Sequence, residues 1–196
     1  ASIREQDSEG SIAIVGGEAY LPYHRPPLSK GYLIEGDWEP ADVYHEEEDW
    51  YGEQKITFHS GVRITGLDLD GRIATLSSGE TVDYEKLLLA TGAELIHLNV
   101  PGSDLRGLYY LRAIPDTETL IQASEAAERA VVVGGGFIGL ELASAFRQRE
   151  LEVTLVYMED RMWERMLSPE ISRWLEAYYR SKGIALMNGS QVAEFR

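Results

Sequence analysis

The sequence predicts an α/β fold in which parallel sheets are covered by helices. The second half alternates apolar strand patterns with helical patterns in the order β-α-β-α-β, which is typical of a parallel sheet. Three glycines between its first strand and first helix fit G-x-G-x-x-G, the turn that binds dinucleotide phosphates. A further strand, "SIAIVGGE" at 11–18, ends in glycines and an acid, like the second strand of another such unit. We therefore predict two Rossmann-like dinucleotide-binding domains, both incomplete, in residues 1–109 and 110–196.

The first half predicts short elements separated by turns. Residues 1–10 are typical of the tail of a helix. The prolines of "LPYHRPPLSK" forbid regular structure, and Ser29 can cap a helix that begins there. The acidic "YHEEEDWYGEQ" predicts another helix. Alternating apolar and polar residues then predict strands joined by hairpins at Asp70-Gly71 and Ser78-Gly79, ending in a buried strand, "KLLLATGA".

The second half is more regular, and 99–112 form the crossing that leads into it. The elements expected after the crossing are a helix at about 116–128 with Asp116 as its N-cap, a strand at 131–133, a helix at 139–149, a strand at 151–157 and a helix at 169–182. The last stretch, "GIALMNGSQVAEF", predicts a third strand and the beginning of another.

Each glycine of "VVVGGGFIGLELASAF" has its own physical reason. Gly134 permits the tight turn, Gly136 lets a pyrophosphate approach the backbone, and Gly139 lets helix and strand pack closely. The N-terminus of the helix adds unpaired N–H groups and partial positive charge. The alternative is a glycine-rich turn without a ligand, but the strand–turn–helix–strand context favours the binding turn.

The tip of the second strand bears on which nucleotide the turn prefers. An acid normally stands there and binds the adenosine ribose hydroxyls, whereas here the tip is Tyr157, with Glu159 close behind. Glu159 can substitute for the acid, or Tyr157 can stack or hydrogen-bond instead. Arg161 and Arg165 follow, and either could meet a 2′-phosphate. We predict NADH rather than NADPH.

Charge and composition exclude several classes of protein. The formal net charge of −15 argues against nucleic-acid binding, because phosphate binding needs clustered Lys and Arg. No run of about 18 apolar residues and no basic leader followed by an apolar stretch is present, so we predict no membrane span and a cytoplasmic location. Cysteine is absent, which excludes disulfides, cysteine-ligated zinc and a thiol nucleophile within this chain. No metal site is predicted.

Much of the negative charge is local. Residues 35–53 contain nine Asp or Glu and no Lys or Arg. A solvated surface segment explains such a run better than a binding site does. Because it would repel an acidic protein partner, we expect any docking surface to lie elsewhere.

Four stretches resemble one family in the correct order along the chain: "LPYHRPPLSKGYL", "YEKLLLATGA", "LYYLRAIPDTETL" and "AVVVGGGFIGLELASAF". They are similar to the FAD-dependent NADH:ferredoxin reductases of bacterial oxygenase systems, within the pyridine nucleotide-disulfide oxidoreductase superfamily. The R-P-P-L-S-K stretch is specific to a few branches, which include apoptosis-inducing-factor-like proteins. The resemblance implies an FAD domain followed by an NADH domain, of which this chain is an internal segment.

The resemblance also implies roles for individual residues. Glu18 matches the acid that binds the FAD ribose, and Arg25 and Lys30 match positions that lie against the flavin. The other matches in this half are Val62, whose backbone contacts the adenine, Thr91 and Gly92, where the chain passes the cofactor, and Arg112, which contacts the pyrophosphate region.

In the NADH half, Gly136, Phe137 and Ile138 match the phosphate turn. Glu141 matches a carboxylate that approaches the nicotinamide and pairs with Lys30. Such a pair would keep both charges satisfied, and the lysine would favour the electron-rich reduced flavin. Without the family match, both residues are explained equally well as solvated helix residues, and Arg112 is explained as a salt-bridge partner.

The missing cysteines separate branches of the superfamily. Disulfide reductases carry C-x-x-x-x-C, and peroxidase branches carry one cysteine, near the position of "RPPLSKGYL", which contains none. The resemblance therefore implies that electrons leave the flavin for an external iron–sulfur protein, a ferredoxin or rubredoxin. The alternatives are an apoptosis-inducing-factor-like redox or binding flavoprotein and a structural fragment that binds no flavin.

Overall fold

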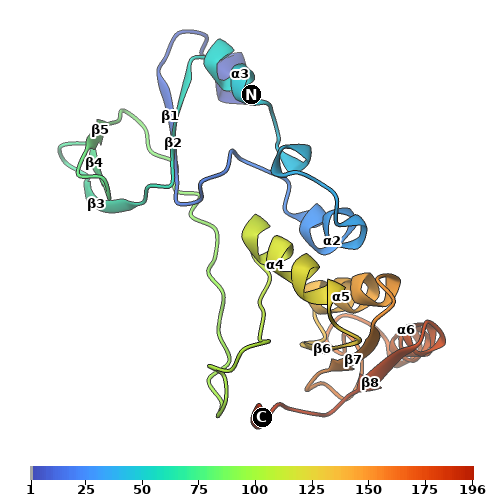
Figure 1. Ribbon diagram of the computed structural model, residues 1–196. Coiled ribbons are helices and arrows are strands. Elements are labelled where there is room, and N and C mark those ends of the chain that lie inside the picture. Colours follow the sequence, from blue (N-terminus) through green and yellow to red (C-terminus); the bar gives the residue numbers. More distant parts are fainter. Residues whose placement is uncertain (1) are drawn as a thin grey trace. The chain divides into compact units, whose positions relative to one another are not determined.

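The computed structural model describes residues 2–196, whose helices and strands are labelled in Figure 1. Contacts divide these residues into two compact units. The first comprises the chain up to His24 and Glu39–Ala93, and the second comprises Arg25–Trp38 and Glu94–Arg196. The units are defined by contacts rather than by cofactor, so the division into residues 1–109 and 110–196 stays a prediction.

The first unit contains two small sheets. β1 (Ile12–Gly16) pairs in parallel with β2 (Ile56–Ser60). β3 (Ile64–Asp68), β4 (Ile73–Leu76) and β5 (Thr81–Asp83) form an antiparallel sheet in that order. The two predicted hairpin turns are confirmed, but β2 does not belong to this run, because its backbone pairs with β1 instead.

Short helices accompany these strands. The predicted acidic helix is confirmed as α3 (Glu48–Glu53), and a short 3₁₀ helix, η2 (Pro40–Val43), precedes it. α1 (Ser2–Gln6) is the predicted N-terminal helix. The side chains of Val43 and Tyr51 are buried within this unit.

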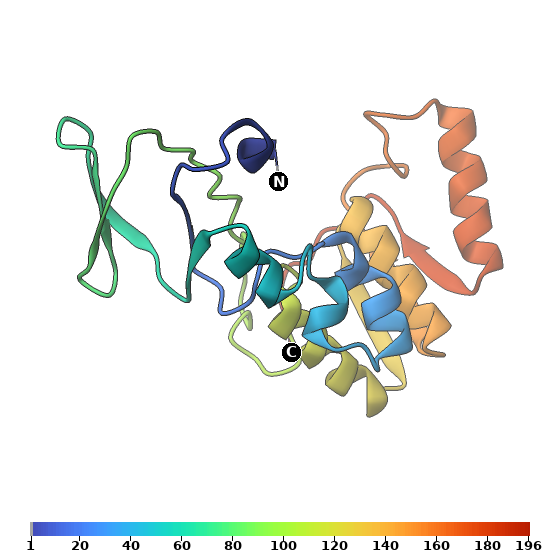
Figure 2. The ribbon, with the colours of Figure 1, turned by 90° about the horizontal axis from the view of Figure 1, so that it is seen from above.

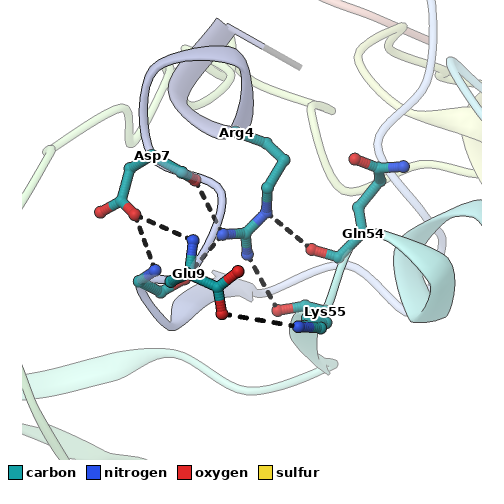
Figure 3. Close-up of polar contacts among 6 residues, drawn as sticks. Arg4, Asp7, Glu9, Gln54 and Lys55 are labelled. Atoms are coloured by element: carbon teal, nitrogen blue, oxygen red, sulfur yellow. Dashed lines mark hydrogen bonds and ion pairs between the residues drawn. The ribbon is translucent and has the colours of Figure 1, made fainter.

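The Arg4 guanidinium fastens α1 to the loop before β2 (Figure 3). Its Nε donates to the Gln54 carbonyl at 2.9 Å, and its Nη1 donates to the carbonyls of Asp7 at 2.9 Å and Gly10 at 2.8 Å. Nη2 donates to the Lys55 carbonyl at 3.3 Å. One side chain thus satisfies backbone carbonyls before β1 and before β2, which attaches an otherwise solvent-exposed five-residue helix to the sheet.

A three-stranded parallel sheet forms the centre of the second unit. Its strands are β6 (Arg129–Val133), β7 (Glu152–Val156) and β8 (Ile184–Met187), in that order. α5 (Phe137–Gln148) packs against β6 and β7, and α6 (Pro169–Ser181) packs against β8. The predicted α/β fold with helices on parallel strands is confirmed.

The two faces of this sheet differ in burial. Val132 and Leu155 point towards the helices and are buried, as the alternation of side chains along a strand requires. Val131 and Val133 point the other way and are exposed. The apolar strand pattern therefore indicates a sheet built to be covered on both faces, of which α5 and α6 cover one.

Residues 25–38 form the helical part that joins this unit from the first half of the chain. They contain η1 (Pro26–Ser29) and α2 (Gly31–Glu35). α2 lies against both α5 and α4 (Ile114–Glu125), as Figure 2 shows from above. The buried Thr117 hydroxyl donates to the Leu28 carbonyl at 3.2 Å and thereby holds η1 on α4.

Two of the predicted helix starts were wrong. Lys30, not Ser29, is the N-cap of α2, because the prolines begin a 3₁₀ turn that already includes Ser29. Ala113, not Asp116, is the N-cap of α4. The Asp116 carboxylate still serves that end, since it accepts the amides of Arg112 and Ala113, each at 2.8 Å.

The predicted buried strand "KLLLATGA" is also wrong. Its residues have no strand geometry, and Leu88 and Leu89 are 80% and 63% exposed. A strand needs a neighbour for its backbone N–H and C=O groups, and none of the described strands lies beside this segment. Among residues 2–196, no helix is long and apolar enough to cross a membrane.

Candidate functional site

The glycine turn between β6 and α5 has the backbone geometry that its sequence predicts. Gly134 has φ of 113°, a left-handed conformation that favours glycine, and its amide donates to the Val156 carbonyl at 2.8 Å. A Cβ built on Gly139 would lie 1.9 Å from the Gly134 carbonyl oxygen. The first turn of α5 therefore rests directly on the end of β6.

The backbone of this turn suits the binding of a phosphate group. A Cβ built on Gly136 would meet nothing within 4 Å, so the backbone there is open to a ligand. Phe137 and Ile138, at the start of α5, have exposed side chains. The first N–H groups of a helix have no partner within the helix, and together with the helix dipole they attract phosphate oxygens. The open backbone at Gly136 and the unpaired N–H groups thus lie at the same end of α5.

Trp163, which the sequence reasoning missed, borders the same turn. Its ring lies 4.6 Å from that of Phe137, measured between centroids. Its backbone has φ of 50°, an uncommon value for a bulky residue. Its indole Nε1 is buried and has no hydrogen-bond partner among the described residues. No motif or spacing marks Trp163, since it comes from an irregular loop after β7.

Tyr157, at the tip of β7, points into the protein. Its side chain is buried, and its hydroxyl donates to Glu176 Oε1 at 3.2 Å. Burial, and then the neighbouring Glu176 carboxylate, raise the pKa of Tyr157. Its ring packs on Gly135, where an added Cβ would come within 2.9 Å of it. Tyr157 therefore supports the turn from inside, and its stacking on or hydrogen bonding to a nucleotide stays a prediction.

The arginines after β7 have different environments. The Arg161 Nη1 donates to the Leu167 carbonyl at 2.7 Å and to the Ser172 hydroxyl at 2.8 Å, so it holds its own loop on α6. This engagement argues against a role for Arg161 in binding a 2′-phosphate. Glu159 and Arg165 have exposed side chains and keep their predicted roles at the nucleotide ribose.

The expected ion pair between Lys30 and Glu141 is present in the second unit. Lys30 Nζ lies 2.8 Å from Glu141 Oε1. The Ser29 hydroxyl, which the sequence reasoning proposed as a helix cap, donates to Glu141 Oε2 at 2.5 Å. Lys30 Nζ also donates to the Pro26 carbonyl at 3.3 Å. Both carboxylate oxygens of Glu141 are therefore held by neighbouring residues of one segment.

The pKa of Glu141 reflects this arrangement. Partial burial alone would raise the pKa, but the hydrogen bonds from Lys30 and Ser29, together with the charge of Lys30, outweigh burial. The pKa of Glu141 consequently lies below its ordinary value. The carboxylate stays ionised at neutral pH and can orient a positive charge beside it.

Arg25 and Arg112 also meet in the second unit. Arg25 Nη1 donates to the Arg112 carbonyl at 2.7 Å. The Arg112 amide is bound to Asp116, so this backbone stretch is fixed from two sides. The predicted flavin-facing arginine and the predicted pyrophosphate arginine therefore lie next to each other, although their contact with a cofactor stays a prediction.

Two predicted residues of the first unit, Glu18 and Val62, lie at the carboxyl ends of β1 and β2, where ligands bind in open α/β sheets. Glu18 follows β1, and its Oε2 accepts the Tyr23 hydroxyl at 2.5 Å. The Val62 amide donates to the Gly16 carbonyl at 3.1 Å. These positions fit a nucleotide at that edge. Thr91 and Gly92 lie in the exposed segment after β5, which forms neither helix nor strand.

Comparison with known proteins is consistent with this geometry. Residues 1–196 match the family described as pyridine nucleotide-disulphide oxidoreductase. The chain is 37% identical to the ferredoxin reductase component of chlorobenzene dioxygenase from Cupriavidus sp. (strain PS12), over 99% of this chain and 47% of that protein. It is 34% identical to the peroxisomal monodehydroascorbate reductase 1 of Oryza sativa subsp. japonica, over 96% of this chain and 42% of that protein.

Two solved structures extend the comparison. The ferredoxin reductase for the CYP199A2 system from Rhodopseudomonas palustris superimposes with a TM-score of 0.94 at 36% identity, over 100% of this chain and 48% of that one. The covalent putidaredoxin reductase–putidaredoxin complex superimposes with a TM-score of 0.92 at 34% identity, over 99% of this chain and 47% of that one. The chain thus spans just under half the length of these relatives.

Proposed function

Because the chain belongs to the pyridine nucleotide-disulphide oxidoreductase family, we propose that its protein is an FAD-dependent NAD(P)H oxidoreductase that reduces an iron–sulfur protein. When bound, FAD would accept a hydride from the nicotinamide and release electrons one at a time. The residues of this chain would bind, orient and electrostatically tune that pair of cofactors.

Two sets of residues would hold the cofactors. The open turn at Gly136 and the first N–H groups of α5 would bind the NAD(H) pyrophosphate. Glu18 would bind the FAD ribose and the Val62 backbone would contact the adenine, with Arg25 and Arg112 contributing charge near the flavin and its phosphates. Phe137 and Ile138 would cover the dinucleotide beside the turn.

The observation that carries the proposal is the position of Glu141 on α5. The same helix begins at the phosphate-binding turn and, one turn later, presents a carboxylate paired with Lys30. Lys30 belongs to the R-P-P-L-S-K segment that lies against the flavin in the family that the sequence resembles. A single helix would therefore connect nicotinamide binding with the charge beside the flavin.

The acceptor is proposed to be a ferredoxin or rubredoxin. Two relatives, the chlorobenzene dioxygenase component and the CYP199A2-system protein, are ferredoxin reductases, and a third was solved bound to putidaredoxin. The chain has no cysteine to accept electrons internally. Monodehydroascorbate reductases are similarly related, which makes an organic radical the alternative acceptor.

The test begins with purified protein to which FAD is added under anaerobic conditions. NADH should bleach the flavin band, and NADPH should do so more slowly if Glu159 rather than Arg165 meets the ribose. The reduced protein is then mixed with a ferredoxin, a rubredoxin or monodehydroascorbate. Fast reduction of an iron–sulfur protein supports the proposal, and fast reduction of monodehydroascorbate alone overturns the choice of acceptor.

The same spectra separate the remaining alternatives. Retained flavin that NADH reduces but that no acceptor reoxidises quickly would favour an apoptosis-inducing-factor-like role. Failure to retain flavin would favour a structural fragment. A cytoplasmic location of the protein stays a prediction.

A further inference from the structure

The Glu141 carboxylate is held by two donors that differ in mobility. Ser29 is 5% exposed and has one side-chain torsion to the oxygen, whereas the Lys30 side chain is 50% exposed and has a long flexible stem. An exposed ion pair contributes little, because solvent screens it and the side chains lose entropy. A short hydrogen bond from a buried hydroxyl to a carboxylate is among the stronger kinds. The serine is thus the firmer of the two contacts.

The backbone of Ser29 is itself fixed. Pro26 and Pro27 set their own φ values in η1, and the Leu28 carbonyl is bound by the buried Thr117 of α4. The hydroxyl that reaches Glu141 therefore starts from a position determined by two helices other than α5. Rigid support of this kind is what keeps a functional side chain in one orientation.

We propose that Ser29 is a positioning residue for the nicotinamide–flavin site, which fixes the orientation of the Glu141 carboxylate and through it the place of the Lys30 ammonium. This inference rests on the proposed function. The carboxylate, anchored at Oε2 by Ser29, offers Oε1 to the lysine in one direction. Without the hydroxyl, the carboxylate would rotate and the exposed lysine would follow it.

The groups that face Glu141 make its titration interpretable. They are Lys30 and, from α6, Tyr179, whose pKa is raised by burial and by the Glu141 charge. With its pKa raised, the Tyr179 hydroxyl stays protonated throughout the acid range. A change in the acid limb of a pH profile would therefore report on Glu141, and loss of the Ser29 donor should move that limb to higher pH.

The experiment compares Ser29→Ala with Ser29→Thr, which keeps a hydroxyl, and with the control Ser144→Ala, which removes a hydroxyl from α5 that contacts Gln148 instead. In the FAD-loaded protein, Ser29→Ala should slow flavin reduction by NADH about tenfold at pH 7, the size expected for one charge-assisted hydrogen bond. The KM for NADH should stay unchanged. Ser29→Thr should recover most of the rate, and Ser144→Ala should match the wild type.

A second readout needs no turnover. The carboxyl carbon of Glu141 is followed by NMR as the pH is lowered, in the wild type and in each variant. Ser29→Ala should raise the pKa of Glu141, and Ser144→Ala should not. Equal titrations in Ser29→Ala and Ser144→Ala would overturn the inference. If NADH never reduces the wild-type flavin, the proposed function fails, whereas the titration still decides whether Ser29 controls Glu141.

Discussion

Removal of the Arg149 side chain tests how the second unit holds residues 25–38. Arg149 follows the end of α5, and its Nη1 donates to the carbonyls of Leu33 at 3.0 Å and Ile34 at 3.3 Å. Its Nε donates to the Ser124 hydroxyl at 2.8 Å. One guanidinium therefore joins the ends of α2, α4 and α5.

The size of the effect follows from these three contacts. A hydrogen bond from a charged donor contributes about 1.5–3 kcal/mol when it is buried. Arg149 is only half-buried, and water replaces part of the loss at partly exposed carbonyls, so the three bonds together should contribute about 2–3 kcal/mol. Arg149→Lys keeps the charge but cannot reproduce the fork of donors, and it should recover less than half of this free energy.

Urea unfolding at neutral pH measures the free energy of unfolding of each variant. Arg173→Ala is the matched control, because the Arg173 side chain is exposed on α6, and its change should stay within about 0.5 kcal/mol. An Arg149→Ala variant as stable as the control would refute the claim that this side chain fixes residues 25–38. A loss of stability equal in Arg149→Lys and Arg149→Ala would show that geometry, not charge, is decisive.

Three further predictions concern the nucleotide site and its support. Gly136→Ala should weaken NADH binding at least tenfold, because the added Cβ fills the open space at the turn, while the free energy of unfolding changes by less than about 1 kcal/mol. Titration calorimetry measures the affinity and urea unfolding measures the stability. An unaffected NADH affinity would exclude the turn as the phosphate site. Glu176→Ala should destabilise the protein by about 2–4 kcal/mol, since it leaves the Tyr157 hydroxyl and the Met162 amide buried without their acceptor. Tyr157→Phe should destabilise it by only about 1 kcal/mol. Similar losses of stability in the two variants would contradict this account. The Glu141–Lys30 ion pair should contribute fully to stability above the ordinary glutamate pKa, and this contribution should disappear as the pH falls through the lowered pKa of Glu141 in the folded state. In urea unfolding over a series of pH values, Glu141→Gln should therefore destabilise the protein at pH 7 but not at the acid end.

Local patterns were enough to predict the second unit in outline. Val131–Val133, the glycines and the amphipathic segment after them predict a strand, a turn and a helix, because each is set by contacts between near neighbours and by backbone conformation. The Lys30–Glu141 pair was expected from the resemblance to a family, and periodicity alone gave no reason to join those residues.

Only the tertiary structure decided which polar groups meet across long separations. Ser29 and Glu141 are 112 positions apart, and Arg149 lies 116 positions from the carbonyl that it binds. Neither contact leaves a local signal, because a serine after prolines equally suits a helix cap and an arginine at a helix end equally suits solvent.

Burial was likewise decided by packing rather than by residue type. Tyr157 stands where an acid usually meets the ribose, yet its hydroxyl turns inward because Glu176 of α6 offers an acceptor. The apolar Leu88 and Leu89 suit a buried strand but are exposed, since none of the strands within residues 2–196 pairs with them. The sequence by itself determined the order and type of most elements. Whether a polar residue is paired, or a strand-forming residue is buried, depended on partners that only the folded chain supplies.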